Sequence, residues 1–515
     1  MTEGAKAVRL PNKIEALIPI VFLLAVMIIN YVQGWGADPH IPVTLACAVA
    51  MIVGKICGWN YKDMLAAGLE AVNQSLEAII IILLVGCLIG TFTACGTIPA
   101  VVYYGLKLFS PAVFLPFVTI LCAAVGIALG SAWTVTATLG IAFMAIGTTM
   151  GLNPALIAGA VLSGACCGDK FSPLSDSTNL AAGSAQTGLF DHVGAMITTT
   201  FPSLVIAICI YGFLSFQKVG EYDPSLANAL SQEIVNHYNY MSPVLLIPIL
   251  LIIVVAVVKM PAIPSVVLLS LIGAAFAMIF QGADLAGCID NLHYGYSCDY
   301  TYGEEAEVAQ NLFAKLVNRG GMDSMLWTNN LVIVAVGFGG ILQKIGSVES
   351  LLGHLIKKVK NPFQLVIVTI LTSVFCITTM CDQYLGLIIP ASMYKDNFDE
   401  MGLGRNMLSR SLEDGGTLWS PLVPWSSCGA YHSSILGVPT LSYAPFCFMN
   451  LINPIFAIVT ASWGGNILFA DGSRTNIFGR LKKGNGPAGA PDAAHEKAMK
   501  ALAEKRAAGV YKKLA

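Results

Sequence analysis

The sequence predicts an all-α polytopic membrane protein, and three observations predict it. Of the 515 residues, 56% are hydrophobic and only 11% are charged, whereas about a quarter of a typical soluble domain is charged. The chain also carries an internal duplication. Finally, each half of the duplication contains a polar segment interrupted by proline, at 164–179 and at 413–422. The net charge of −2 gives no indication of a nucleic-acid partner.

The duplication is visible as short motifs that recur in the same order about 250 residues apart. The matched motifs are Val85-Gly86 with Val336-Gly337, Thr119-Ile120-Leu121 with Thr369-Ile370-Leu371, Met150-Gly151-Leu152 with Met401-Gly402-Leu403, and Ser172-Pro173-Leu174 with Ser420-Pro421-Leu422. A collinear series at near-constant offset indicates a repeated unit. We therefore predict a first inverted repeat at 1–216, a linker at 217–240, a second inverted repeat at 241–463 and a cytoplasmic tail at 464–515, which is expected to be solvated from about residue 480 onward.

Long apolar stretches predict the elements of each repeat, because a helix needs about 20 apolar residues to cross a bilayer. The first repeat is expected to contain helices at 14–32, 41–57 and 78–95, an amphipathic stretch at 97–109, a paired segment at 112–150, a broken helix at 154–186 and a last helix at 192–216. The second is expected to contain the equivalent segments 241–258, 262–281, 328–345, 347–360, 363–398, 404–437 and 441–463. No small-residue cleavage pattern follows the first apolar stretch, so it is predicted to be a membrane helix and not a signal peptide.

The two paired segments are interpreted as re-entrant hairpins because their centres are polar. Ten spanning helices and two hairpins then give the repeats opposite orientations. Basic residues such as Lys55, Lys62 and Lys344 fall on the side of the N-terminus, which places both termini in the cytoplasm by the positive-inside rule. Two full spans in place of each hairpin give the same parity, so the charge pattern leaves fourteen spans open.

The first broken helix contains Pro173, which removes a backbone hydrogen bond and disrupts the helix. In lipid, the freed carbonyl groups must meet protein, water or an ion. Carboxylate, hydroxyl and carbonyl oxygens that converge at such a break suit a hard cation such as Na⁺, and breaks at equivalent positions of two repeats indicate a transporter's binding site. The expected polar site consists of Asp169, Ser172, Ser175, Asp176, Thr178 and Asn179, with Ser131, Thr134 and Thr136 from the first hairpin. The alternative is a structural ion pair of Lys170 with Asp169 or Asp176.

A second polar site is expected at the other break, formed by Asp382, Glu413, Asp414, Thr417 and Ser420. Adjacent carboxylates repel each other, so one of the pair at 413 and 414 would hold a proton near neutral pH and exchange it for Na⁺. The alternatives are that Arg405 or Arg410 neutralises one of the pair, and that Asp382 caps a helix. Trp425 either packs or lines a substrate pocket. The candidate Na⁺ ligands are Asp169, Asp176, Asp382 and Asp414.

Other classes of protein are disfavoured by the motifs. We find no His-Glu-x-x-His or Gly-x-Ser-x-Gly sequence, so an enzyme is not expected. Cys166-Cys167 has no companion ligand at metal spacing, and no cofactor is implied. A channel is also disfavoured, because a channel would usually need several subunits around one pore.

The motifs at the two breaks and at the second hairpin resemble those of a known family. Gly168-Asp169-Lys170, Ser172-Pro173-Leu174-Ser175-Asp176 and Thr178-Asn179-Leu180-Ala181 are similar to the signature of the NhaC family of Na⁺/H⁺ antiporters. Leu412-Glu413-Asp414, Ser420-Pro421-Leu422, Pro424-Trp425, Cys428-Gly429-Ala430 and Asp382-Gln383-Tyr384 resemble its other motifs. The likeness covers roughly residues 14–463. Gly415-Gly416, Cys166-Cys167 and a long 282–325 loop depart from the family pattern.

The resemblance implies a secondary active Na⁺/H⁺ antiporter that works by alternating access in the bacterial cytoplasmic (inner) membrane. The alternative that it leaves open is a Na⁺-coupled or Na⁺/H⁺-coupled exchanger of an organic acid, such as malate or lactate, or of an amino acid. The expected partners are membrane lipid, Na⁺, protons and, in the alternative, a small organic anion or amino acid. The resemblance also implies membership of the ion-transporter superfamily. A homodimer stays open, because the scaffold halves of transporters in that superfamily often dimerise.

Overall fold

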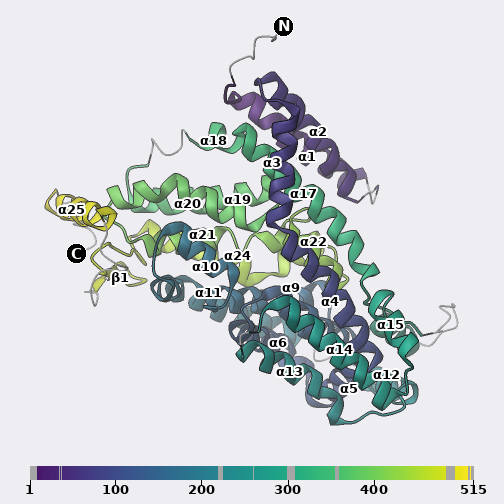
Figure 1. The fold of residues 1–515 in the computed structure, drawn as a ribbon. Helices are drawn as coiled ribbons and strands as arrows, with labels where there is room; N and C mark the ends of the chain where they lie inside the picture. Colours follow the sequence, from purple (N-terminus) through teal and green to yellow (C-terminus); the bar gives the residue numbers. More distant parts are fainter. Residues whose placement is uncertain are drawn as a thin grey trace, which may run out of the picture.

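The computed structural model describes residues 8–33, 35, 38–217, 224–258, 260–298, 308–353, 359–482, 493–508 and 511. Helices account for nearly all of its regular structure (Figure 1). The first part contains α1 (Lys13–Gln33), α2 (His40–Ile56), α3 (Tyr61–Gln74), α4 (Leu76–Ala94), α5 (Thr97–Leu108), α6 (Pro111–Leu129), α7 (Ala132–Val135), η1 (Thr136–Gly140), α8 (Ile141–Thr149), α9 (Pro154–Phe171), α10 (Asp176–Ala185) and α11 (Leu189–Gln217).

The second part continues with the same kinds of element. It contains α12 (Pro224–His237), η3 (Pro243–Leu246), α13 (Ile247–Val257), α14 (Ala262–Gln281), α15 (Leu285–His293), α16 (Val308–Val317), η4 (Asp323–Met325), α17 (Leu326–Ile345), α18 (Ser347–Leu352), α19 (Pro362–Met380), α20 (Gln383–Glu400), α21 (Arg405–Gly415), η6 (Ser420–Leu422), α22 (Ser427–Leu436), α23 (Thr440–Tyr443), η7 (Ala444–Phe446), α24 (Phe448–Ser462), β1 (Arg474–Thr475), β2 (Leu481–Lys482) and α25 (Ala493–Ala507). The strands β1 and β2 pair antiparallel.

Within the described residues, eight helices are long and apolar enough to cross a membrane, which confirms the predicted all-α polytopic fold. Three of the eight are arms of the two paired segments, α6, α7–α8 and α19. The ten positions where spans were expected all hold helices. Five of them pass the test of length and composition outright, and α23–α24 passes as a pair bent by 55°. Two others, α2 and the α13 segment, are apolar but too short to pass. The two broken helices do not pass because the break shortens each helical piece.

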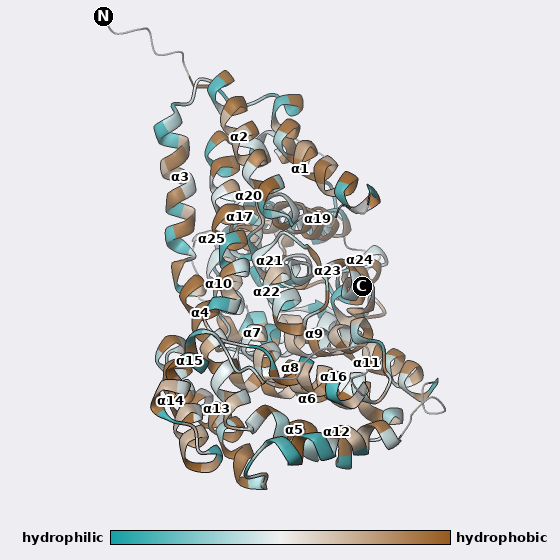
Figure 2. Ribbon diagram, turned by 90° about the vertical axis from the view of Figure 1, so that its right-hand side faces the viewer, coloured by the Kyte–Doolittle hydropathy of each residue, from teal (hydrophilic) through white to brown (hydrophobic). Residues whose placement is uncertain are grey.

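The outer helices α1, α2, α13 and α14 are rich in apolar residues, which Figure 2 shows in brown along their ribbons. Large side chains with more than half of their surface accessible include Ile14, Ile41, Phe213, Phe216, Leu271 and Ile279. Monomeric soluble proteins rarely expose such extended apolar surface. These faces therefore fit contact with lipid.

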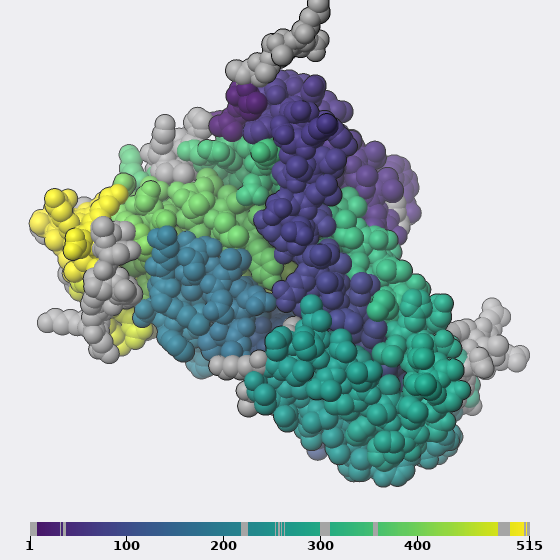
Figure 3. Space-filling model, viewed as in Figure 1, coloured from purple at the N-terminus to yellow at the C-terminus, as the bar shows by residue number. Residues whose placement is uncertain are grey.

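The two halves exchange packing partners. The helices α1 and α2 of the first half pack with each other, and α2 packs on α17 of the second half. Conversely, α14 of the second half packs on α4 of the first. Figure 3 shows the resulting outline, with the purple N-terminal helices at one end and the teal α13–α15 region at the other. Between these two ends lie the broken helices (Figure 1).

The broken helix α9 is held closely against α6 by small residues. A Cβ atom on Gly164 would lie 2.3 Å from the Thr119 carbonyl oxygen, and one on Gly168 would lie 2.3 Å from the Ala123 carbonyl oxygen. Two glycines four residues apart on one face let helix backbones approach this closely. The Thr119 hydroxyl also donates to the Ala160 carbonyl at 3.2 Å. Hence α6 fixes the position of the helix that leads to the first break.

The C-terminal helix α25 packs on the protein, whereas this segment was expected to be solvated. Leu502 is 2% exposed and lies against Gly402, where the φ of +67° and the contact with Leu502 both favour glycine. Arg506 donates to Asp471 at 2.7 Å and to the Ser473 hydroxyl at 2.8 Å, and Tyr511 donates to the Met401 carbonyl. The segment is polar in overall composition, but single apolar side chains such as Leu502 are buried against the protein. The composition alone does not reveal this contact.

The Asp471–Arg506 contact predicts that the docking of α25 on the protein depends on pH. Burial favours a higher pKa for the Asp471 carboxyl, but hydrogen bonds from Ser473 and Arg506 outweigh it, so its pKa lies below the usual range. A lowered native pKa stabilises the docked helix at pH values above the ordinary Asp value of about 4, and this contribution disappears as the pH falls below it. We expect wild type to show slower amide exchange in α25 than Asp471→Asn at pH 7, and the difference to disappear as the pH falls through the lowered native pKa of Asp471.

Asp396→Asn, on the exposed side of α20, is the matched control and should leave exchange in α25 unchanged. A difference between wild type and Asp471→Asn that persists at the lowest pH would contradict the role given to the Asp471 carboxylate.

Candidate functional site

The first break separates α9 from α10. The backbone of Ser172 is extended at φ −80° and ψ 125°, and that of Ser175 at φ −72° and ψ 134°. Side chains after the break bond the carbonyls that it frees. The Thr178 hydroxyl donates to the carbonyls of Asp169 and Lys170 at 3.3 and 3.2 Å, and the Asn179 amide donates to those of Pro173 and Ser175 at 3.0 and 2.8 Å. Two predicted site residues, Thr178 and Asn179, thus bond the freed carbonyl groups and stabilise the unwound backbone of the break.

The carboxylate of Asp169 lies at the end of α9 and is 8% exposed. The Ser177 hydroxyl lies 3.4 Å from its Oδ2, and the hydroxyls of Ser175 and Ser177 are 3.0 Å apart. Asp176, the first residue of α10, is exposed. Oxygen atoms from the end of one helix and the start of the next therefore converge on the same region.

The second break separates α21 from α22 and includes the short turn η6. Its carbonyl groups are bonded by distant side chains. Tyr443 donates to Pro421 at 2.7 Å, Asn450 donates to Leu418 at 2.9 Å, and Ser426 donates to Ser420 at 2.6 Å. These bonds satisfy backbone groups that a continuous helix would have satisfied internally.

Glu413 lies just before this break and is 0% exposed, yet neither carboxylate oxygen makes a hydrogen bond of good geometry to the described residues. The hydroxyls of Thr417 and Ser420 and the side-chain oxygens of Asn450 and Asn453 are also buried without a partner there. Most buried polar groups in proteins are hydrogen-bonded. A buried carboxylate without a hydrogen-bond partner can accept a proton or a cation.

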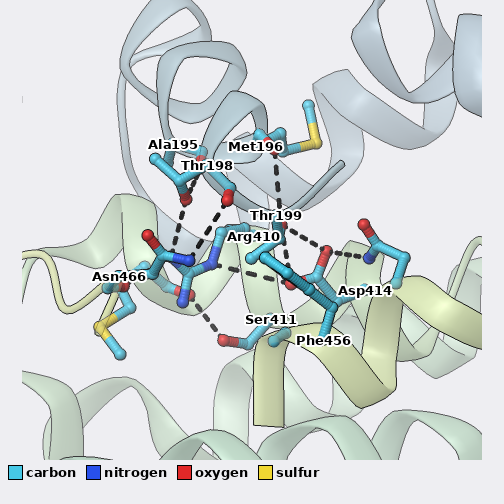
Figure 4. Close-up of polar contacts among 12 residues, drawn as sticks. Ala195, Met196, Thr198, Thr199, Arg410, Ser411, Asp414, Phe456 and Asn466 are labelled. Atoms are coloured by element: carbon cyan, nitrogen blue, oxygen red, sulfur yellow. Dashed lines mark hydrogen bonds and ion pairs between the residues drawn. The ribbon is translucent and has the colours of Figure 1, made fainter. Parts of the chain in front are cut away.

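Asp414, the neighbour of Glu413, has the opposite environment (Figure 4). Its carboxylate accepts from Lys170 of α9 and from Asn453 at 2.7 Å, and Arg410 lies one turn earlier with its Nε 3.7 Å from Oδ2. The Thr199 hydroxyl is 3.3 Å from Oδ1. Lys170 therefore pairs with a residue of the second half, and not with Asp169 or Asp176.

Arg405 and Arg410, which were considered as neutralising groups for the pair at 413 and 414, contact different carboxylates. Arg410 donates to the Asn466 carbonyl at 2.8 Å and to Thr198 at 3.2 Å, in addition to its contact with Asp414. Arg405 instead donates to Asp399 at 3.0 Å. Sequence reasoning missed Thr199 and Asn453 as partners of Asp414, since nothing local relates these helices to α21.

The tips of the two hairpins approach the broken helices. In the first hairpin, Ser131 accepts from the backbone N–H of Thr134 at 3.3 Å, which caps the short α7, and the Thr136 hydroxyl donates back to Ala132. Tyr431 of α22 donates to the Trp133 carbonyl at 3.1 Å, and their rings stack at 4.4 Å. The first hairpin is therefore joined to the second broken helix.

In the second hairpin, Asp382 caps α20 by accepting from the N–H of Leu385 at 3.0 Å. The backbone N–H of Ser427 donates to the Cys381 carbonyl at 3.0 Å, and Trp425 donates to the Thr378 carbonyl at 2.8 Å. Trp425 thus fastens the hairpin to the chain that enters α22.

A cavity of about 390 Å³ lies where these elements meet. Seven predicted site residues line it: Ser131, Thr134, Asp169, Ser175, Asp176, Asp382 and Thr417. The others lie outside its lining: Thr136, Ser172, Thr178, Asn179, Glu413, Asp414, Ser420 and Trp425. The lining also includes Gln383, Tyr384, Cys428 and His432. Of these, Gln383, Tyr384 and Cys428 lie within the motifs quoted above.

Comparison with known proteins gives a consistent result. Residues 164–464 match the model of the Na⁺/H⁺ antiporter family. The chain is 34% identical over 423 residues to the Na⁺/H⁺ antiporter NhaC of Alkalihalophilus pseudofirmus, covering 82% of this chain and 89% of the relative. It is 34% identical over 455 residues to the malate-2H⁺/Na⁺-lactate antiporter of Bacillus subtilis, covering 88% and 95%.

A third relative is the arginine/ornithine antiporter ArcD of Halobacterium salinarum, which is 31% identical over 475 residues, 90% of this chain and 94% of the relative. The family match covers both broken helices, and the similarity to each relative extends over most of both chains. This multi-pass membrane protein therefore belongs to the Na⁺/H⁺ antiporter family.

Proposed function

We propose that the protein exchanges Na⁺ for protons by alternating access, with the two broken helices and the two hairpin tips as its transport site. The observation that carries the proposal is the single cavity lined by both hairpin tips, by both sides of the first break and by residues of the second. Ionisable residues within a membrane protein mark ion pathways by default. Family membership supports the same activity.

In the proposed cycle, Na⁺ and H⁺ compete for the carboxylates of Asp169 and Glu413. Asp169 lines the cavity, and Glu413 lies four residues before Thr417, which also lines it. Na⁺ binds while these groups are ionised, with hydroxyls of Ser175 and Thr417 as further oxygen ligands. Protonation from the other side of the membrane neutralises the carboxylates and releases Na⁺.

We assign Asp414 a structural role in this scheme and not that of a Na⁺ ligand. Its carboxylate is already bonded to Lys170 and Asn453 and lies near Arg410. A cation at the same oxygens would have to displace these groups. The pair instead joins the two broken helices, which come from different halves of the chain.

The proposed setting is the bacterial cytoplasmic membrane, with both termini in the cytoplasm and lipid around the apolar outer helices. The positive-inside distribution of lysines supports this orientation. We propose transport without catalysis and without a cofactor. A second candidate function, exchange of an organic solute, is favoured by the size of the cavity, because about 300–1,000 Å³ is typical of small-molecule sites.

Exchange is tested with purified protein in proteoliposomes that hold an acidic interior and a fluorescent pH indicator. External NaCl should dissipate the pH gradient in wild type, whereas choline chloride should not. Asp169→Asn should slow the Na⁺ response by about 100-fold, since losing an interaction with a buried charged group costs about 2–3 kcal/mol.

Asp396→Asn, an exposed substitution of the same chemistry on α20, serves as the matched control and should respond as wild type does. A wild-type protein that ignores Na⁺ would contradict the proposed function, and a fully active Asp169→Asn would contradict the site.

A further inference from the structure

The charges around the transport cavity are unbalanced. Three carboxylates line it, from Asp169, Asp176 and Asp382. Among the described residues of the lining, none is a lysine or an arginine. A low-dielectric site with several carboxylates and no fixed cation attracts positive charge and disfavours an anion.

The buried cations nearby do not correct this imbalance. Lys170 is fully buried and bonded to Asp414. Arg410 is directed to Asp414, Thr198 and the Asn466 carbonyl (Figure 4). Neither of them lines the cavity. Both cations are thus directed toward Asp414, and neither side chain forms part of the cavity wall.

Helix N-termini are the other common source of positive potential, and two of them already carry carboxylates. Asp382 caps the N-terminus of α20 through the N–H of Leu385, and Asp176 is the first residue of α10. The start of α22 is capped by Ser426, whose hydroxyl accepts from the N–H of Gly429 at 3.0 Å. The ends of α20 and α22 are thus capped by the protein's own acceptors, and that of α10 carries the negative charge of Asp176.

The remainder of the lining is suited to the body of an organic molecule. Ile252, Val255 and Leu269 of α13 and α14 form an apolar wall, and the aromatic residues Trp133 and Tyr384 also line the cavity. Two buried polar atoms in the lining have no partner among the described residues, the hydroxyl of Thr417 (3% exposed) and Nδ1 of His432 (1% exposed). The cavity therefore combines acidic, aromatic, apolar and unsatisfied polar surfaces.

We infer that the cavity binds a small organic cation, an alkylammonium or guanidinium compound, that competes with Na⁺ and is exchanged in its place. The cationic group would make charge-assisted hydrogen bonds to the carboxylates and contact the aromatic faces, while its carbon chain covers the wall of α13 and α14. This inference rests on the proposed function and extends it. It also separates the organic cargoes considered above, since a dicarboxylate such as malate is repelled by Asp169, Asp176 and Asp382 whenever these groups are ionised and hold no cation.

The test uses agmatine, a four-carbon chain with one ammonium and one guanidinium group. Uptake of ¹⁴C-agmatine is measured in proteoliposomes loaded with NaCl or with choline chloride, alongside uptake of ¹⁴C-malate. Internal Na⁺ should raise agmatine uptake by about tenfold, external Na⁺ should inhibit it, and malate uptake should stay at the level of protein-free liposomes. Isotope counting is used because free amines disturb pH gradients by themselves.

Substitutions in the wall provide a second readout. Leu269→Trp reduces the cavity volume, so the ratio of agmatine uptake to Na⁺/H⁺ exchange should fall by at least about tenfold; Val255→Phe tests the same wall if the first variant does not fold. Leu271→Trp on the exposed side of α14 is the matched control and should leave both rates unchanged. An unaltered ratio in both folded wall variants would contradict the inference.

The outcomes also distinguish the inference from the proposed function. If NaCl dissipates the pH gradient but agmatine is neither taken up nor inhibitory, or if malate is carried instead, the organic-cation site is wrong and Na⁺/H⁺ exchange stands. If agmatine raises the melting temperature of the purified protein and is transported while Na⁺ has no effect, the cation site is supported and Na⁺/H⁺ exchange is contradicted.

Discussion

Asp414→Asn is expected to lower the free energy of unfolding by about 3–5 kcal/mol, because it leaves buried cations without their counter-ion. Lys170 and Asp414 are both 0% exposed, and Arg410 is also buried. An asparagine at 414 keeps the shape of the side chain but removes the negative charge that both cations face. The expected observation is a clear drop in the melting temperature of the purified protein, followed by tryptophan fluorescence in detergent.

Two further variants isolate the cause. Lys170→Met in the Asp414→Asn background removes one of the orphaned charges and should recover part of the lost stability, as expected for groups that interact directly. Glu400→Gln breaks the exposed Lys497–Glu400 pair, whose side chains are 55% and 59% exposed at 3.6 Å, and should change the stability by less than about 1 kcal/mol. Equal melting temperatures for Asp414→Asn and Glu400→Gln would show that the buried network does not hold the broken helices together.

Glu413→Gln is expected to reduce the rate of Na⁺/H⁺ exchange by about 100-fold or more without unfolding the protein. The proposed cycle needs a carboxyl group that alternates between a proton and Na⁺, and a glutamine amide cannot take up the proton that displaces Na⁺. The substitution keeps the volume of the side chain and removes a charge that is costly to bury without a partner. The melting temperature should therefore be unchanged or slightly raised. The exchange rate is measured as the decay of an imposed pH gradient after addition of NaCl.

The matched control is Glu349→Gln, the same substitution at an exposed position of α18, and it should exchange Na⁺ at the wild-type rate. A folded Glu413→Gln variant that keeps a rate close to that of wild type would exclude Glu413 from the transported-ion site. Exchange would then be assigned to the carboxylates that line the cavity, those of Asp169, Asp176 and Asp382, alone.

The contrast between these two predictions shows what a linear pattern cannot reveal. Glu413 and Asp414 are adjacent in the sequence and were predicted together, as members of one cation site. Successive residues of an α-helix point about 100° apart, so the Glu413 carboxylate is buried without a hydrogen-bond partner among the described residues, while that of Asp414 meets Lys170 and Asn453. Whether each acid binds cargo or holds the fold together depends on the neighbours of α21.

The sequence by itself determined the features whose causes are local or periodic. Apolar stretches marked the membrane helices, because a bilayer requires their length and composition. The breaks fell beside Pro173 and Pro421, where proline removes a backbone donor and its ring obstructs the preceding turn, and α9–α10 and α21–α22 begin and end close to the predicted bounds. Polar side chains at these breaks followed from the need to satisfy the freed carbonyls.

Only the tertiary structure decided which groups meet. Lys170 and Asp414 are 244 positions apart, and the partners of Asp414 come from α9, α11 and α24. The cavity likewise exists only because both hairpin tips, both broken helices and the wall of α13 and α14 converge. Proline and glycine act on their own turn of the chain, whereas charge pairing and cavity shape depend on packing between segments from the two halves. For that physical reason the sequence pointed to the acidic residues, and their separate roles follow from the fold.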